Sequence, residues 1–228
     1  LHYARNIPDR FRQLVADYGV PAVWVNTRGD ENCAYPDDIQ GSRDATLRLI
    51  AEGRRDVVYV RHCRRYQPPA YAGRHYSEHD REVGYTQAMQ AAGLEPRIVE
   101  PALAGPTHPA AALDAWRQWL NAQRPIAAAL CYDSVEALPL MYAAGAAGLT
   151  VPDDLTVCCF HHQDPLEASN FSPRIIVVPL HDIGPAAVDQ LALMAEPRKL
   201  RVPSVAVPYQ FTNWPASPAV ADDHIPSR

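Results

Sequence analysis

Two cysteines and two histidines follow one another at residues 158–162 and form the densest group of reactive side chains in the sequence. The run Leu155 to Phe160 is apolar and contains β-branched Thr156 and Val157, which favours a buried parallel strand. His161 and His162 come directly after it. Open α/β sheets bind ligands beyond the carboxyl ends of their strands, so the sequence predicts a polar binding site at this strand end.

The same residues could in principle hold a metal ion or supply a nucleophile. Consecutive strand residues point to opposite faces, so Cys158 and Cys159 cannot both face one ion without a bulge. Zinc ligands are also usually separated by two or more residues, and nothing in the sequence pairs a nucleophile with an oriented base. We therefore predict no catalytic residue, no metal and no cofactor, and an enzyme that uses the His/Cys cluster is the least favoured interpretation.

Other predicted strands also end in hydrogen-bonding groups. The strand in residues 22–26 ends at Asn26, and the strand at Ile126 to Cys131 is followed by Tyr132, Asp133 and Ser134. Each of these strands comes after a predicted helix, which is the pattern of βα units around parallel sheets. The fold class is therefore predicted to be α/β, with polar side chains gathered at strand ends.

Residues 61–79 interrupt this pattern with three tyrosines, three histidines and two adjacent prolines. Loops of this length are usually functional or disordered, so we expect either a surface excursion or a lid over a site. The next helix is predicted from Asp80 to Ala92, with Tyr85 and Met89 on one face.

Composition narrows the class of protein. The chain has 228 residues, 47% of them hydrophobic, and a net charge of −5, which predicts one or two globular domains and no general attraction to nucleic acid. No apolar run is long enough for a membrane span, the first residues do not resemble a signal peptide, and five cysteines without a regular framework fit a reducing cytoplasm. We expect a cytoplasmic protein that does not contact a membrane.

Five stretches in order resemble the effector-binding domain of bacterial transcriptional regulators of the lactose- and purine-repressor (LacI) family, which is related to periplasmic sugar-binding proteins. The resemblance covers roughly residues 8 to 214. The stretches are GVPAVWVN, DDIQGSRDATLRLIAEGRRDVVYV, REVGYTQAMQAAGL, RPIAAALCYDSVEAL and GLTVPDDLTVCCFHHQD.

The resemblance implies an effector site between two subdomains. Arg81 matches the arginine that grips the effector in the family, and its planar fork suits vicinal hydroxyls or a carboxylate. The alternative for Arg81 is an exposed surface ion pair, and the alternative for Asp133 is a helix N-cap. The expected effector-binding residues are Asn26, His75, Ser77, Arg81, Tyr132, Asp133 and His161.

Four positions depart from the family pattern. His161 and His162 replace aspartates, Cys159 replaces a glycine, and Tyr132 replaces an asparagine. Neutral imidazole offers one donor and one acceptor where a carboxylate only accepts. We therefore expect a ligand other than a standard hexose, with an anionic or aromatic group favoured.

The expected architecture is periplasmic-binding-protein-like, with two Rossmann-like α/β/α subdomains and a ligand cleft between them. Residues 1–38 with 179–200 form an incomplete N-terminal subdomain, residues 39–178 with 201–214 form the C-terminal subdomain, and 215–228 form a tail. Crossovers are expected near 37–39, 178–180 and about 200. The first one or two βα units of the N-terminal subdomain are expected to be missing, because residues 1–3 resemble the end of the family's third strand.

The implied function is that of the sensing domain of a DNA-binding regulator. A small polar effector, sugar-like or another metabolite, would alter a homodimer that contacts DNA through a domain outside this chain. The alternative is a periplasmic or transport-type sugar-binding protein on the same fold.

Overall fold

Helices and strands alternate through the protein and confirm the α/β class. The computed structural model describes residues 7, 9–62, 75–100, 109–122, 126–162, 173–195, 200–212 and 214–215. The helices are α1 (Asp9–Asp17), α2 (Asp38–Ala51), α3 (Tyr76–Ala91), α4 (Pro109–Ala122), α5 (Ser134–Ala146) and α6 (Leu180–Ala195). The strands are β1 (Trp24–Val25), β2 (Cys33–Pro36), β3 (Val57–Val60), β4 (Arg97–Val99), β5 (Ala128–Cys131), β6 (Thr156–His161), β7 (Arg174–Val177), β8 (Val205–Val207) and β9 (Gln210–Thr212).

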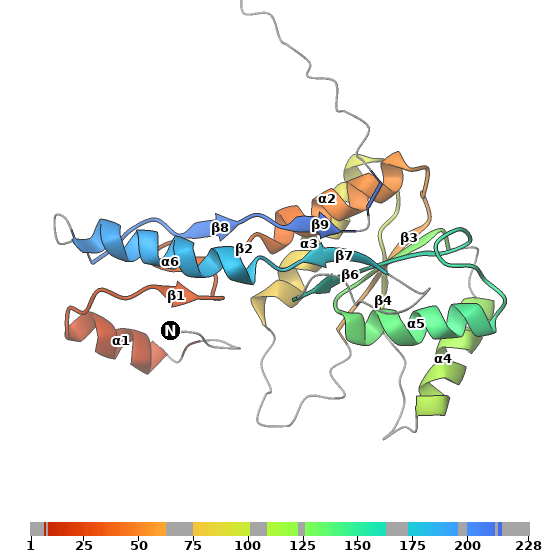
Figure 1. The fold of residues 1–228 in the computed structure, drawn as a ribbon, viewed down its shortest axis with the longest axis horizontal. Coiled ribbons are helices and arrows are strands. Elements are labelled where there is room, and N and C mark those ends of the chain that lie inside the picture. Colours follow the sequence, from red (N-terminus) through yellow and green to blue (C-terminus); the bar gives the residue numbers. More distant parts are fainter. Residues whose placement is uncertain are drawn as a thin grey trace, which may run out of the picture.

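The strands form two sheets that lie side by side along the long axis of the molecule (Figure 1). The larger sheet has six strands in the order β4-β3-β5-β6-β7-β9, and the smaller has three in the order β1-β2-β8. All described pairs within the sheets are parallel except β7 with β9. Parallel strands need helical crossovers, which explains the alternating pattern in the sequence.

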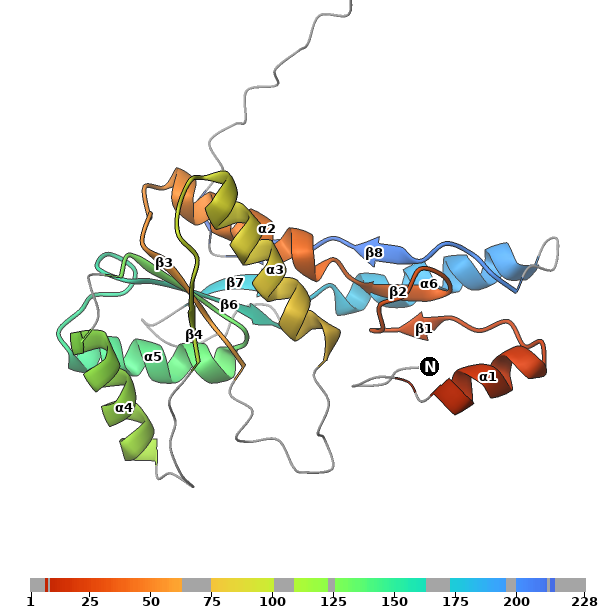
Figure 2. The same ribbon diagram turned by 180° about the vertical axis from the view of Figure 1, so that it is seen from behind.

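Each sheet is covered by helices on both faces. In the larger sheet, α2 and α3 pack on one face and α4 and α5 on the other, as the view from behind also shows (Figure 2). Trp116 of α4 is 3% exposed in the core against α5 and the sheet. In the smaller sheet, α6 packs on one face and α1 on the other.

The strand β6 separates its two cysteines as the alternation of strand side chains requires. Cys158 packs in the core beneath α2 and α3, whereas Cys159 packs in the core beneath α4 and α5. The two thiols therefore lie on opposite faces of the sheet. Both are fully buried, and burial raises the pKa of each, so they behave as small apolar side chains.

The chain crosses between the two sheets three times. It passes from β2 to α2 at residues 36–38, from β7 to α6 at 177–180, and from β8 to β9 at 207–210. The third crossover was expected near residue 200, and residues 201–214 were assigned to the C-terminal subdomain. Strand pairing corrects this, because β8 pairs with β2 in the smaller sheet and only β9 joins the larger one.

Helix α3 begins four residues earlier than the expected start at Asp80. Its N-cap is His75, whose side chain accepts from the backbone of Ser77, and Glu78 returns a bond to the backbone of His75. This is a capping box with histidine in place of the usual serine or threonine. The expected lid at 61–79 lies largely outside the described residues, as do residues 1–6 and most of the expected tail.

No helix among the described residues is long and apolar enough to cross a membrane.

Candidate functional site

Strands β3, β5 and β6 end at the same edge of the larger sheet, next to the start of α3. Parallel registers set this arrangement, since Val60 pairs with Cys131 and Cys131 with Cys159. The residues after these strands and the first turns of α3 therefore meet at one edge. This edge faces the smaller sheet (Figure 1). In that sheet β1 ends at Val25, and Asn26 follows it.

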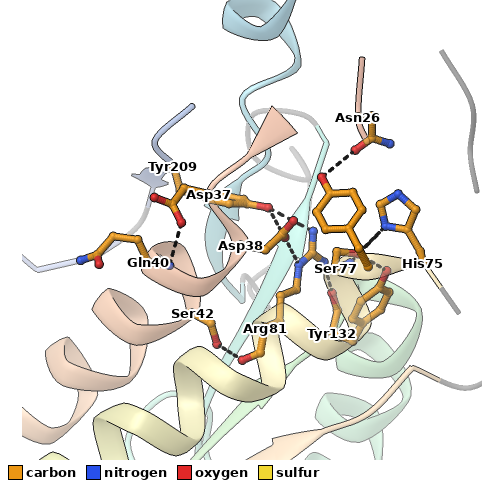
Figure 3. Close-up of polar contacts among 11 residues, drawn as sticks. Asn26, Asp37, Asp38, Gln40, Ser42, His75, Ser77, Arg81, Tyr132 and Tyr209 are labelled. Atoms are coloured by element: carbon orange, nitrogen blue, oxygen red, sulfur yellow. Dashed lines mark hydrogen bonds and ion pairs between the residues drawn. The ribbon is translucent and has the colours of Figure 1, made fainter. Parts of the chain in front are cut away.

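A chain of hydrogen bonds joins three of the expected site residues. The hydroxyl of Ser77 lies 2.7 Å from His75 Nδ1 and 2.9 Å from the hydroxyl of Tyr132 (Figure 3). Because the backbone N–H of Ser77 also donates to Nδ1, that nitrogen is an acceptor and the neutral ring carries its proton on Nε2. Burial lowers the pKa of His75, which favours this neutral form.

The Nε2 atom of His75 is buried. It makes no hydrogen bond of normal geometry within the described part of the chain, although the backbone of Asn26 acts to raise the His75 pKa against the effect of burial. A buried N–H without a good acceptor is costly. It is therefore a group that a ligand atom could satisfy.

Two pairs of residues connect the first turns of α3 to the smaller sheet. The hydroxyl of Tyr76 donates to Asn26 Oδ1 at 3.3 Å, and the Tyr76 ring packs edge-on against Tyr35 of β2. One turn further, Arg28 forms an ion pair with Asp80. Asn26 adopts a positive φ of 56°, which asparagine tolerates better than most residues. The two halves of the molecule thus touch at the expected site.

Arg81 is buried, so the alternative of an exposed surface ion pair is wrong. Its Nε donates to Asp38 Oδ1 at 2.6 Å, its Nη1 to the carbonyl of Tyr132 at 2.8 Å and its Nη2 to the hydroxyl of Tyr209 at 3.2 Å (Figure 3). Burial lowers the pKa of the Arg81 guanidinium, but Tyr209 and Asp38 raise it well above its usual value. Asp38 and Tyr209 were missed by the sequence prediction.

Asp133 caps helix α5. Its Oδ1 accepts from the backbone N–H of Val135 at 3.4 Å and from the hydroxyl of Ser134 at 2.8 Å. The helix N-cap considered as the alternative role for Asp133 is therefore present. The carboxylate lies at the same strand end as Tyr132, which leaves ligand contact open to test.

His161 stands at the end of β6 and is partly buried. Its Nδ1 is buried without a hydrogen-bond partner in the described chain, and its carbonyl accepts from the backbone N–H of Val178 at 2.9 Å. His162 follows it, and burial lowers the His162 pKa. The strand end thus holds a polar ring atom with unused hydrogen-bonding capacity.

A further histidine of this edge was not singled out by the sequence. His62 lies just beyond β3, with Nδ1 3.2 Å from Glu136 Oε1 and its ring 4.7 Å from that of Tyr132. Burial lowers the His62 pKa, but the contact with Glu136 outweighs it, and the net shift is upward. The signal available was a histidine near the start of residues 61–79, where the βα pattern is interrupted just after β3.

Two surface hollows lie away from this edge. One, of about 510 Å³, is lined by Val57 and Met89 at the amino end of β3. The other, of about 420 Å³, lies between α1 and the segment at Leu200. Neither contains an expected site residue.

The periplasmic binding protein-like domain family provides a model that matches residues 46–212. The chain belongs to this family. The match begins within α2, covers all six strands of the larger sheet with α3, α4 and α5, and extends through α6 to β9. The expected family relationship is therefore confirmed.

Known relatives agree with this assignment. The chain is 24% identical over 219 residues to the HTH-type transcriptional regulator RegA of Clostridium saccharobutylicum, covering 92% of this chain and 62% of RegA. The chain thus spans less than two thirds of that relative. It resembles the Escherichia coli transcriptional repressor ascG with a TM-score of 0.70 and 17% identity, over 93% of this chain and 75% of that one. A complex of the regulator CelR with cellobiose gives a TM-score of 0.64 at 19% identity, over 93% and 63%. The expected fold is confirmed.

Proposed function

We propose that this chain is the effector-sensing part of a DNA-binding transcriptional regulator. A small polar molecule binds between the two α/β halves, and DNA is contacted by a domain outside this chain. The proposal is supported by the family of the chain and by its relationship to a protein named as an HTH-type regulator. We further propose a homodimer that works in the cytoplasm.

The observation that carries the proposal is the meeting of polar side chains from both halves at one sheet edge. Ser77 and Tyr132 come from the larger half, and Tyr76 joins them to Asn26 of the smaller half. Converging polar groups among aromatic rings are typical of small-molecule sites. A ligand that touches both halves has different affinities for their open and closed arrangements, which is the physical basis of a switch.

The charges at this edge favour an effector recognised by neutral hydrogen bonds. The described cations are already paired, Arg81 with Asp38 and Arg28 with Asp80. The polar atoms without a partner in the described chain include His75 Nε2 and His161 Nδ1. The His62 ring and the Arg81 guanidinium already pack against the ring of Tyr132. We therefore propose that Tyr132 contacts the ligand through its hydroxyl rather than through the face of its ring. These features favour a polar ligand over the anionic or aromatic one expected from the histidines alone.

The experiment is a binding screen followed by substitution. Neutral sugars, sugar phosphates and nucleobases are screened by thermal shift, because a ligand that binds only the folded state raises the midpoint. The strongest binder is then titrated calorimetrically into the wild-type chain and into His161→Ala. Weaker binding by His161→Ala is expected, and undiminished affinity would remove His161 from the site.

The full-length protein provides the functional test. A regulator shows ligand-dependent binding to a DNA fragment from its own promoter region. A leader peptide and export of the full-length protein would instead favour a periplasmic or transport-type binding protein. Turnover of the ligand that is lost on substitution of His161 or Cys159 would favour an enzyme.

A further inference from the structure

Two of the three crossovers are bonded directly to each other. The backbone N–H of Asp37, in the first crossover, donates to the carbonyl of Val207 in the third at 2.9 Å. Just beyond these two residues, Asp38 and Tyr209 meet through a hydrogen bond of 2.5 Å. The hinge between the two halves therefore has a polar centre built from both crossover strands.

Arg81 joins this hinge centre to the edge of the larger sheet. Its guanidinium donates to Asp38 and Tyr209 on the hinge side and to the carbonyl of Tyr132 on the other (Figure 3). It also lies over the ring of Phe160, 3.9 Å from its centroid. A planar fork with several donors can hold three partners in a fixed geometry, which a flexible ammonium cannot.

The base of this arrangement is tightly packed. The hydroxyl of Ser42 on α2 donates to the carbonyl of Arg81 at 2.6 Å, which ties α3 to α2 at this turn. A Cβ added at Gly41 would lie 2.4 Å from the ring of Tyr209. Arg81 and Tyr209 are both nearly fully buried. Tight packing favours discrete rather than graded displacement.

The remaining crossover, the second along the chain, runs between β7 and α6 and reaches the same edge by a different route. Its residue Val178 donates its N–H to the carbonyl of His161. Each crossover is therefore bonded, directly or through Arg81, to a residue of the candidate site. A change at Tyr132 or His161 has a short path to the hinge.

We propose that Arg81 is a hinge-positioning residue in this chain, which sets the relative orientation of the two halves by holding the first and third crossovers to Tyr132. This role differs from the effector grip implied by resemblance, because each of the three guanidinium nitrogens already donates a hydrogen bond to a protein partner. The inference rests on the proposed cleft only for its link to a ligand. The positioning of the crossovers is a property of the chain without any ligand.

The test uses a matched pair of buried tyrosines. Tyr209→Phe removes the hydroxyl between Arg81 and Asp38, whereas Tyr85→Phe removes a buried hydroxyl bonded to Val57 and Arg97, away from the hinge. Amide hydrogen exchange is followed at Asp37, whose N–H bonds Val207, with the core amide of Ala129 as a reference for global unfolding. Losing one hydrogen bond corresponds to about five- to tenfold faster local exchange.

We expect Tyr209→Phe to accelerate exchange at Asp37 relative to Ala129 about five- to tenfold, and Tyr85→Phe to leave that ratio unchanged. Arg81→Lys, which keeps the charge but loses the fork, should act like Tyr209→Phe. Spin labels at Gln90 on α3 and Asp189 on α6, placed without cysteine chemistry, should give a broader distance distribution in both hinge variants.

The hinge role would be overturned if the ratio of exchange rates at Asp37 and Ala129 were equal in Tyr209→Phe and Tyr85→Phe. An unchanged distance distribution in Arg81→Lys would overturn it as well. These measurements need no ligand. A hinge that loosens in a chain that binds nothing would leave the hinge role standing and refute the proposed sensing function. Conversely, ligand binding at the edge with an unaffected hinge would refute only the role of Arg81.

Discussion

Tyr209 and Asp38 are 171 residues apart in the sequence, yet the tyrosine hydroxyl donates to the aspartate Oδ1 at 2.5 Å. Each residue belongs to a different strand of the hinge between the two halves. Arg81 contacts both of them. The most deeply buried ion pair at the candidate site is therefore part of the hinge, and its stability and its function can be tested separately.

Breaking this ion pair should destabilise the fold strongly. The side chains of Arg81 and Asp38 are 6% and 1% exposed, so Arg81→Met leaves a buried carboxylate without its cation. The expected loss in the free energy of unfolding is about 3–5 kcal/mol. Arg61→Met is the control, because Arg61 and Glu82 are 34% and 22% exposed and such pairs contribute about 0–1 kcal/mol. Chemical denaturation measures both, and similar losses would contradict a buried role for Arg81.

Substitution by alanine should change the stability of the fold in opposite directions at two helical glycines. A Cβ at Gly84 on α3 would lie 2.1 Å from the carbonyl oxygen of Ile39 on α2, while a Cβ at Gly184 on α6 meets nothing within 4 Å. Gly84→Ala should destabilise by about 1–3 kcal/mol through overpacking. Gly184→Ala should stabilise by about 0.5–1 kcal/mol, since alanine is the better helix former. Thermal unfolding of the two variants distinguishes them, and a neutral Gly84→Ala would mean that α2 and α3 are less closely packed.

The two roles of Asp133 can be separated by a conservative change. Because asparagine caps helices as well as aspartate does, Asp133→Asn should leave stability nearly unchanged, while Asp133→Ala should cost about 0.5–2 kcal/mol. If Asp133 is only a cap, Asp133→Asn binds the effector as the wild type does. A loss of affinity in Asp133→Asn at unchanged stability would instead identify a ligand contact through the carboxylate charge.

The pair of His62 and Glu136 should make stability depend on pH. The His62 pKa in the folded protein is raised above its usual value of 6.5 by Glu136, which outweighs burial. A raised pKa stabilises the fold fully below pH 6.5, and this contribution is lost as the pH rises through the folded pKa. His62→Gln should therefore be most destabilised relative to wild type at about pH 5.5, with a smaller difference at about pH 8.5.

His75 should show the opposite dependence, which serves as the control. Burial lowers its pKa below 6.5, so its contribution is present above pH 6.5 and is lost as the pH falls toward the folded pKa. His75→Gln should differ from wild type less at about pH 5.5 than at about pH 8.5. Denaturation curves at both pH values test the pair. The same direction of pH dependence in both variants would show that one of the two assigned environments is wrong.

Local patterns in the sequence predicted most of the elements correctly. The apolar run before His161 became β6, and the strand expected at Ile126 to Cys131 became β5 at Ala128–Cys131. Gly53 and Gly93 both adopt positive φ just past α2 and α3, which is a common local signal for the end of a helix. The spacing of apolar residues and the residues that cap helices act over a few positions. A single sequence therefore carries the information needed to locate helices and strands.

Long-range contacts decided what the sequence did not predict. The partners of Arg81 lie 43 and 128 residues away, and no local period reveals them. The third crossover lies at 207–210 because Val205–Val207 pairs with β2, a choice made by sheet topology. The early start of α3 depended on an unusual histidine cap. Resemblance pointed to the edge of the candidate site, but could not show that Arg81 is bonded to both crossovers.

The most direct test of the account is calorimetric titration of the effector found by the thermal-shift screen into Ser77→Ala and Ser204→Ala. Ser77 bridges His75 and Tyr132 at the proposed site, whereas Ser204 accepts from the backbone of Cys33 in the smaller sheet. We predict that Ser77→Ala weakens binding about tenfold, the equivalent of about one hydrogen bond, and that Ser204→Ala binds as the wild type does. An absence of any binder, or equal affinities of the two variants, would contradict an effector site at this edge.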